Sequence, residues 1–108
     1  MLLRLPEGEK RALYALAELN GRSANEETCR AIADWISTNR RKPLPGSAHA
    51  APEAGPQTQS MLVRMMPSVR GDLYQMAELN GRSANEEVLR ALRRWVEVEE
   101  RRLAAAST

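Results

Sequence analysis

The sequence predicts a mainly α-helical fold with one short two-stranded antiparallel β-ribbon, built from two copies of a strand–helix–helix unit. Two observations indicate the repeat: a nine-residue stretch occurs twice, sixty residues apart, and a short apolar run precedes each occurrence. The third observation is size, because a unit of about forty residues usually needs a partner to be stable. The two copies in this chain of 108 residues are therefore expected to fold together, with paired strands and four helices on one face of the ribbon.

The repeated stretch is a helix end followed directly by a helix start. It runs from Leu19 to Glu27 and again from Leu79 to Glu87. Gly21 supplies the left-handed conformation that commonly ends a helix. Ser23, with Glu26 three residues later, forms a capping box for the next helix. The stretch therefore predicts a tight corner between two helices, and the chain contains two such corners.

The repeat divides the chain into segments. Copy one is expected at residues 1–38 and copy two at residues 60–103, followed by a short tail at 104–108. The intervening residues 39–59 are rich in Pro, Ala, Gly and Ser and lack hydrophobic periodicity, which is typical of a flexible linker. The linker contains His49, which has no second histidine or cysteine cluster with which to share a metal ion. No metal site is therefore expected.

Each copy is expected to begin with a strand. Met1–Leu5 and Met61–Met65 are apolar runs that are too short for a helix, and Pro6 ends the first. Alternate side chains of a strand share one face. The side chains expected to face outward are those of Leu2, Arg4, Ser60, Leu62 and Arg64. Those expected to face the core are Met1, Leu3, Leu5, Met61, Val63 and Met65.

Two helices are expected after each strand. In copy one they are Glu7–Leu19 and about Ala24–Ser37, where apolar residues recur at helical spacing. Trp35 lies beside the apolar stripe of the second helix and corresponds to Trp95, so both indoles are expected in the core or at an interface. In copy two the second helix can continue to about Leu103.

Composition narrows the possible functions. The formal charge of +2 permits a polyanionic partner without requiring one. The single cysteine, Cys29, excludes an internal disulfide and is expected to be a buried thiol in a reducing compartment. No apolar stretch is long enough to cross a membrane, so a cytoplasmic location is expected. Catalytic constellations, metal-ligand clusters and glycine-rich phosphate loops are missing, so neither enzymatic activity nor a cofactor is expected.

Taken together, the motifs resemble the ribbon-helix-helix family of DNA-binding proteins. Leu3-Arg4-Leu5-Pro6 and Asn20–Glu27 are most similar to the Arc repressor type within that family. The resemblance covers nearly all of the chain outside the linker. In this family two chains form one ribbon that enters the major groove. Here one chain supplies both strands, so the resemblance implies a tandem ribbon-helix-helix arrangement that forms an intrachain pseudo-dimer.

The resemblance implies that the outward-facing ribbon side chains touch base edges. These residues are Leu2, Arg4, Ser60, Leu62 and Arg64. Arginine suits bidentate hydrogen bonding to guanine, whereas leucine offers only an apolar contact, for example to a thymine methyl group. The leucines depart from Arc-type ribbons, which carry a polar residue there, and copy one begins at Met1 without a counterpart of Ser60. We therefore expect weak discrimination between DNA sequences and an asymmetric DNA-binding site.

The resemblance also implies phosphate contacts at the start of the second helix of each copy. Free backbone amides there hold an anion at the positive helix end, and they orient the protein without reading sequence. The residues concerned are Ser23, Ala24, Asn25, Ser83, Ala84 and Asn85.

A buried ion pair is implied in each corner. An Arc-type protein has a buried Arg-Glu-Arg triad, and the first two members are matched in both copies of this chain. The matching residues are Arg22, Glu27, Arg82 and Glu87. Alanine stands at the third position, as Ala31 and Ala91, so a simpler structural Arg-Glu pair is expected.

The function indicated is a DNA-binding transcriptional regulator, specifically a repressor that occupies double-stranded DNA together with a second chain on an adjacent half-site. Antitoxins and plasmid-maintenance or relaxosome proteins are alternatives; an antitoxin would have a toxin partner, held by the linker or by the last helix. A protein-interaction module without DNA is a third possibility. Arg40-Arg41-Lys42 and Arg93-Arg94 are candidates for attraction to the DNA backbone or for solvated charge. Glu97, Glu99 and Glu100 predict that the end of the last helix points away from DNA.

Overall fold

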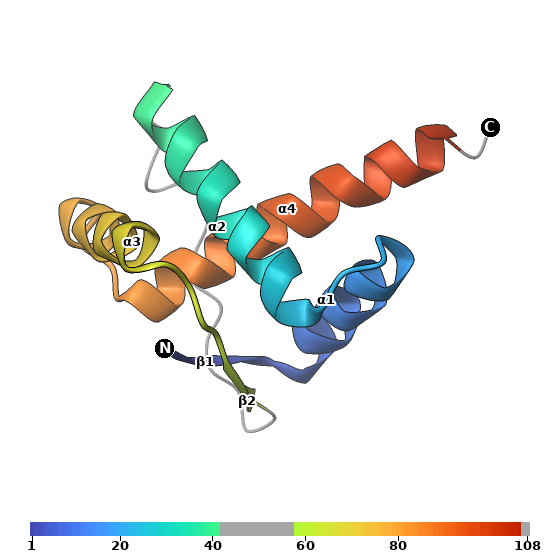
Figure 1. Cartoon of the computed structure of the whole chain (residues 1–108), viewed down its shortest axis with the longest axis horizontal. Helices are drawn as coiled ribbons and strands as arrows, with labels where there is room; N and C mark the ends of the chain where they lie inside the picture. Colours follow the sequence, from blue (N-terminus) through green and yellow to red (C-terminus); the bar gives the residue numbers. More distant parts are fainter. Residues whose placement is uncertain (42–57, 107–108) are drawn as a thin grey trace.

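A computed structural model describes residues 1–41 and 58–106 of the chain. The elements are β1 (Leu2–Pro6), α1 (Glu7–Leu19), α2 (Ala24–Arg41), β2 (Thr58–Leu62), α3 (Pro67–Leu79) and α4 (Ala84–Ala106). The protein is mainly helical and has a short two-stranded antiparallel sheet, as predicted. Figure 1 shows the helices gathered on one side of the two strands, with α2 and α4 crossing in the middle of the molecule.

The register of the antiparallel sheet places Leu2 opposite its equivalent in the second copy, Leu62. The pairs are Leu2 with Leu62, Leu3 with Met61, Arg4 with Ser60, Leu5 with Gln59 and Pro6 with Thr58. The backbone pairing continues one residue further, because the Val63 N–H donates to the Met1 carbonyl oxygen at 2.8 Å. The terminal ammonium of Met1 donates in turn to the Val63 carbonyl oxygen at 2.9 Å. Leu2 and Leu62 are therefore equivalent residues that face each other, near the end of the ladder where the chain begins.

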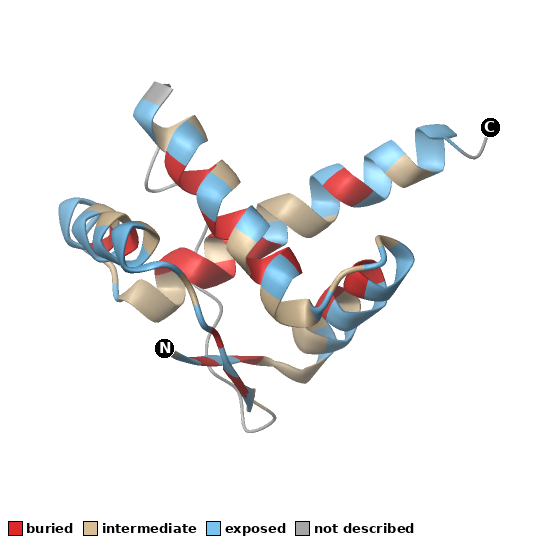
Figure 2. Cartoon of the chain, in the orientation of Figure 1, coloured by how far each residue is buried: buried red, intermediate tan, exposed pale blue. Residues whose placement is uncertain are grey.

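The predicted alternation of the strands is present. Leu3, Leu5, Met61 and Val63 are buried beneath the helices, whereas their neighbours along each strand are exposed. Figure 2 shows buried and exposed residues alternating along both strands. The bounds of β2 differ from those expected, since it begins at Thr58 and ends before Arg64 and Met65. The register set by β1 causes this shift, because Pro6 and Leu5 pair with residues that precede the apolar run.

The hydrophobic core is shared between the two copies. Each first helix contacts both second helices, since α1 packs on α2 and α4, and α3 packs on α4 and α2. The core combines residues from both copies: Leu3, Leu5, Leu13, Ala31, Ile32, Ile36, Met61, Val63, Leu73, Val88, Leu89 and Leu92. Burial across the copies supplies the apolar area that a unit of about forty residues could not bury alone.

The two corners have the predicted local chemistry. Gly21 and Gly81 adopt φ values of 68° and 67°, the left-handed conformation that ends α1 and α3. Ser23 Oγ accepts the backbone N–H of Glu26 at 3.0 Å, which caps α2. The corresponding bond from the Glu86 N–H to Ser83 Oγ caps α4 at 3.1 Å.

Both second helices extend beyond their predicted ends. α2 continues to Arg41, so the first residues of the predicted linker are helical, and β2 contains its last residues. Tertiary contact extends α2, because the Arg40 guanidinium pairs with Asp72 of α3 at 3.0 Å. α4 continues past Leu103 to Ala106, into the predicted tail. His49 and the rest of the predicted linker lie outside the described residues.

Candidate nucleic-acid interface

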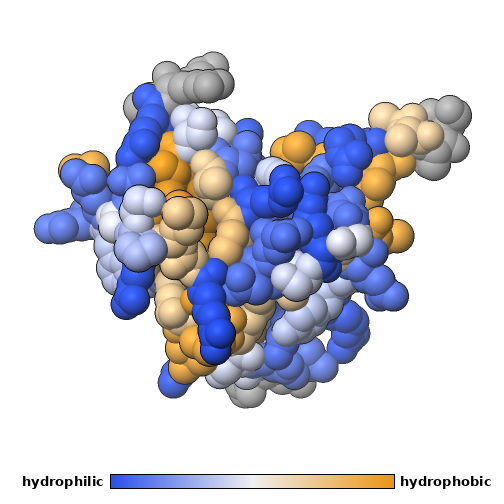
Figure 3. All heavy atoms as spheres, in the orientation of Figure 1, coloured by the Kyte–Doolittle hydropathy of each residue, from blue (hydrophilic) through white to orange (hydrophobic). Residues whose placement is uncertain are grey.

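The outer face of the ribbon brings together all five residues predicted to contact bases. Leu2 and Leu62 are cross-strand partners at its centre, and each is 57% exposed. Arg4 and Ser60 form the next pair on one side, and Arg64 follows Leu62 on the other side. All three polar residues are exposed. In Figure 3, apolar side chains reach the surface at the lower edge, where the strands lie, beside strongly hydrophilic ones.

Two asparagines fix the backbone of the ribbon arginines. Asn85 Oδ1 accepts the Arg4 N–H at 2.8 Å, and Asn85 Nδ2 donates to the Arg4 carbonyl oxygen at 2.9 Å. Asn25 makes the equivalent pair of bonds to Arg64, at 2.7 Å and 3.0 Å. Each asparagine belongs to one copy and each arginine to the other. The four bonds therefore hold the ribbon against the starts of α2 and α4.

The side chains of Asn25 and Asn85 have a role that was not predicted, whereas the expected phosphate contact concerns their backbone amides. Both were predicted to contact phosphate, but their side-chain amides are used by the ribbon backbone. Their backbone amides remain available, since within the described ranges no intramolecular acceptor meets the N–H of Ala24, Asn25 or their equivalents Ala84 and Asn85. These N–H groups lie in the first turn of a helix, where the helix dipole favours an anion.

The serines at the helix starts contribute mainly as caps. Ser23 Oγ and Ser83 Oγ each accept a backbone N–H of their own helix. Glu26 and Glu86 lie in the same first turns. Their carboxylates oppose an incoming phosphate, so the backbone amides supply the anion-binding capacity of these two helix starts.

Two basic residues of the first helices, one of which reaches the edge of the ribbon, were not predicted as site residues. Lys10 and Arg70 occupy equivalent positions in α1 and α3, and each cation lies over a tyrosine ring of its own helix. The distances to the ring centroids are 5.6 Å for Tyr14 and 5.5 Å for Tyr74. Lys10 Nζ also donates to the Ser60 carbonyl oxygen at 3.0 Å, which places this charge at the edge of the ribbon. The sequence feature that could have indicated these two residues is a basic side chain at the same position of both copies.

The predicted structural ion pairs are present and fully buried at the carboxylate. Arg22 Nη1 lies 3.1 Å from Glu27 Oε2, and Arg82 Nη1 lies 3.2 Å from Glu87 Oε2. Both glutamates are 0% exposed. Asn20 contributes an amide donor to Glu27 at 3.2 Å within the same corner.

A tryptophan from the other copy completes each buried site. Trp95 Nε1 donates to Glu27 Oε2 at 2.7 Å, and Trp35 Nε1 donates to Glu87 Oε2 at 2.7 Å. The sequence analysis expected the indoles in the core or at an interface, but it did not assign these hydrogen bonds. The neutral indole N–H thus donates a hydrogen bond to each buried glutamate. In an Arg-Glu-Arg triad, a second arginine donates to the glutamate instead. Because both indole hydrogen bonds cross between copies, the two sites tie α2 and α4 together.

Three arginines of the basic runs expected near the helix ends, Arg40, Arg93 and Arg94, are held in ion pairs, whereas Lys42 and the Arg41 side chain lie outside the described part of the chain. Arg93 Nε donates to Glu9 of α1 at 2.6 Å, and Arg94 Nη1 donates to Asp34 of α2 at 2.7 Å. Arg40 is paired with Asp72. These arginines therefore contribute to the packing of the helices. Figure 1 shows the far end of α4 projecting away from the strands.

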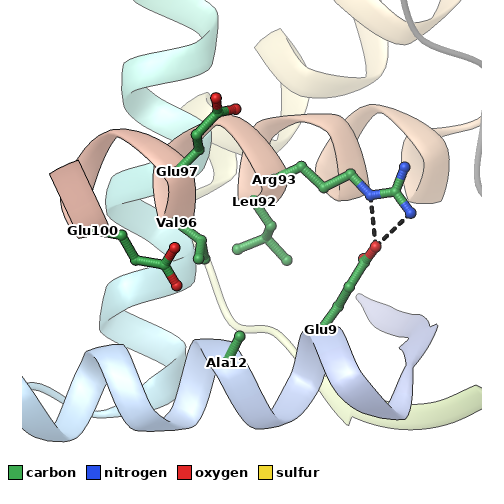
Figure 4. Close-up of a pocket in the computed structure, with 7 residues that line it drawn as sticks. All are labelled: Glu9, Ala12, Leu92, Arg93, Val96, Glu97 and Glu100. Atoms are coloured by element: carbon green, nitrogen blue, oxygen red, sulfur yellow. Dashed lines mark hydrogen bonds and ion pairs between the residues drawn. The ribbon is translucent and has the colours of Figure 1, made fainter.

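A shallow groove lies between α1 and α4, away from the ribbon. Figure 4 shows Leu92 and Val96 directed toward Ala12, with the Arg93–Glu9 ion pair at one end. The groove holds about 190 Å³, which is smaller than the typical site for a small-molecule ligand. Within the described residues, acidic, histidine and cysteine side chains form no group of three or more that could hold a metal ion.

Cys29 lies beneath one ribbon arginine and is half-buried, so the expectation of a buried thiol is wrong, because the residue lies at the margin of the core beside the ribbon backbone. Its Sγ donates to the Arg64 carbonyl oxygen at 3.2 Å. Burial, with a smaller contribution from the charge of Glu26, raises the pKa of the thiol. The thiol therefore stays protonated near neutral pH and acts as a weak donor to the ribbon.

Comparison of the chain with protein-family models, with curated proteins and with solved structures finds no match. In the described part of the chain, no helix combines the length and apolar character needed to span a bilayer.

Proposed function

We propose that this protein is a DNA-binding transcriptional repressor of the ribbon-helix-helix type. In this proposal the two copies form an intrachain pseudo-dimer, and the β1–β2 ribbon enters the major groove of double-stranded DNA. The observation that carries the proposal is the pair of exposed arginines, Arg4 and Arg64, whose backbones are fixed by Asn85 and Asn25. Fixed backbones reduce the ordering cost of placing these side chains against bases.

The dimensions and chemistry of the ribbon support this mode of binding. A two-stranded ribbon fits the major groove, and arginine is the side chain best suited to bidentate contacts with guanine. The free amides at the starts of α2 and α4 would hold phosphates on either side of the groove and set the register. Lys10 and Arg70 add positive charge on the flanking helices.

The placement of acidic residues also supports the proposal. The outer ribbon face formed by Leu2, Arg4, Ser60, Leu62 and Arg64 carries no carboxylate. Glu97 and Glu100 belong to the part of α4 that projects away from the strands (Figure 1). Attraction to a polyanion is therefore concentrated on the ribbon side. Because one ribbon makes few phosphate contacts, the proposal includes a second chain on an adjacent half-site.

Replacing both ribbon arginines tests the proposal. A binding selection from randomised duplexes supplies a preferred site, and fluorescence anisotropy then measures affinity for that site and for random DNA. Each of Arg4→Ala and Arg64→Ala should cost about 1–3 kcal/mol on the preferred site and should relax base preference. The affinity for random DNA should change less, because phosphate contacts dominate it.

A matched control is Arg101→Ala, because Arg101 is an exposed arginine of α4 that pairs with Glu97 far from the ribbon. This variant should keep the affinity and the base preference of the original chain. Equal losses in Arg4→Ala, Arg64→Ala and Arg101→Ala would indicate a general charge effect and would contradict groove reading. Absence of salt-dependent binding to any duplex would instead favour a protein-interaction module without DNA.

A further inference from the structure

We propose that Leu2 and Leu62 recognise a symmetric pair of thymine methyl groups at the centre of the DNA site. The inference rests on the proposed DNA-binding function and adds the base step that the ribbon selects. It starts from the position of the two leucines, which are equivalent residues of the two copies and direct cross-strand partners. Each side chain is 57% exposed, so the core does not account for leucine at these positions.

Thymine is the base that offers an apolar group to such a pair. In the major groove the C5-methyl group of thymine is the distinctive apolar feature, whereas the other base edges present mainly hydrogen-bond donors and acceptors. A leucine pressed against those polar groups would leave them without partners, which is unfavourable. The neighbouring cations, Arg4 and Arg64, favour a polyanion over an apolar protein surface, because an apolar partner would desolvate both charges.

The spacing of the leucines matches adjacent base pairs. Directly opposed residues of an antiparallel pair have Cβ atoms about 4.5–5.5 Å apart. Successive base pairs rise by about 3.4 Å. Two leucine side chains can therefore cover two neighbouring base pairs without bending the ribbon.

Symmetry selects the kind of step. The two-fold relation between Leu2 and Leu62 matches a DNA two-fold axis that passes between base pairs, because only this axis places the same base on both strands. One thymine on each strand of a two-base-pair step gives either TpA or ApT. Arg4 and Arg64 lie two residues from the leucines, about 7 Å along each strand, and would read guanines roughly two base pairs from the centre.

The test replaces the two central thymines of the selected site with uracil, which removes only the C5-methyl groups. Affinity is measured for the original chain and for the double variant Leu2→Ala/Leu62→Ala. The original chain should lose about three- to fivefold in affinity for each methyl group removed. The double variant should bind the thymine and uracil duplexes equally, because alanine is too short to contact the methyl groups.

A matched control is Leu79→Ala, since Leu79 is an exposed leucine at the end of α3, outside the ribbon. This variant should keep the preference for thymine over uracil. Circular dichroism establishes that each variant is folded before binding is measured.

Each other outcome overturns the inference. Equal binding of thymine and uracil duplexes by the original chain, with Arg4→Ala and Arg64→Ala still impaired, would leave DNA binding intact and remove the methyl contact. If the double variant lost as much affinity on the uracil duplex as the original chain does, the loss would come from a change in the DNA and not from contact with the leucines. Failure to bind any duplex would overturn the proposed function as well. Loss of self-association in Leu2→Ala/Leu62→Ala, without an effect on DNA, would identify the leucines as a protein contact.

Discussion

Glu27 and Glu87 are fully buried carboxylates whose donors come from both copies of the repeat. A buried charge is costly unless hydrogen bonds and an opposite charge accompany it, and removing one partner of such a site is usually strongly destabilising. Each glutamate has an arginine from its own corner and an indole from the other copy. At the scale of single residues, these two sites therefore determine how the copies fit together.

Trp95→Phe should destabilise the protein by about 1–3 kcal/mol, because Glu27 would lose a donor while it remains buried. Urea unfolding at neutral pH, followed by circular dichroism, measures the change. Phenylalanine is also smaller, so a double-mutant cycle with Glu27→Gln separates the hydrogen bond from the change in packing. Tyr74→Phe is the control, since its ring lies on the exposed side of α3. Full stability of Trp95→Phe would contradict the assigned bond.

The sequence predicted part of this site. Arg22 and Glu27 belong to one corner motif, so their pairing follows from local spacing. The indole of Trp95 lies 68 residues from Glu27 in sequence, and its hydrogen bond depends on how α2 and α4 cross. The hydrogen-bond partners of Asn25 and Asn85 could not be predicted for the same reason. Their position in the first helical turn correctly indicated a polar role, but the partner of each side chain is the ribbon backbone of the other copy.

At the scale of elements, the starts of α2 and α4 support the ribbon. The helix starts and the glycine corners were predictable because caps and left-handed glycines act within a few residues. The bounds of β2 were not, because Thr58 and Gln59 lack an apolar pattern and become part of a strand only by pairing with β1. The pairing of the two strands is therefore the feature of the elements that could be determined only from the folded structure.

Asn85→Ala should release the backbone of Arg4 and lower the affinity for the selected DNA site. Loss of two hydrogen bonds should also reduce stability by about 1–3 kcal/mol. Amide hydrogen exchange measured by NMR reports the cause directly, since the Arg4 N–H should exchange faster in the variant. Asn39→Ala is the control, because Asn39 donates only to Trp35 within α2. Unchanged exchange at Arg4 together with unchanged affinity would contradict the support assigned to Asn85.

At the scale of the whole molecule, one chain forms a single core from two copies. The size argument predicted this outcome, because neither copy has enough surface to bury both of its helices. The ion pairs between helices could not be predicted from the sequence, because they join residues that are far apart along the chain. Some of the arginines in these pairs were candidates for DNA contact in the sequence. Arg40, Arg93 and Arg94 pair with acidic side chains of another helix, so part of the basic charge outside the ribbon contributes to helix packing.

Protection of guanine N7 from dimethyl sulfate on the selected site tests most directly whether the ribbon occupies the major groove. N7 lies in that groove, and arginine contacts it together with O6. The account predicts that the bound chain protects guanines on both sides of the central step, and that Arg4→Ala and Arg64→Ala each lose protection on one side. Binding without protection of N7, or protection unchanged in both variants, would contradict the account.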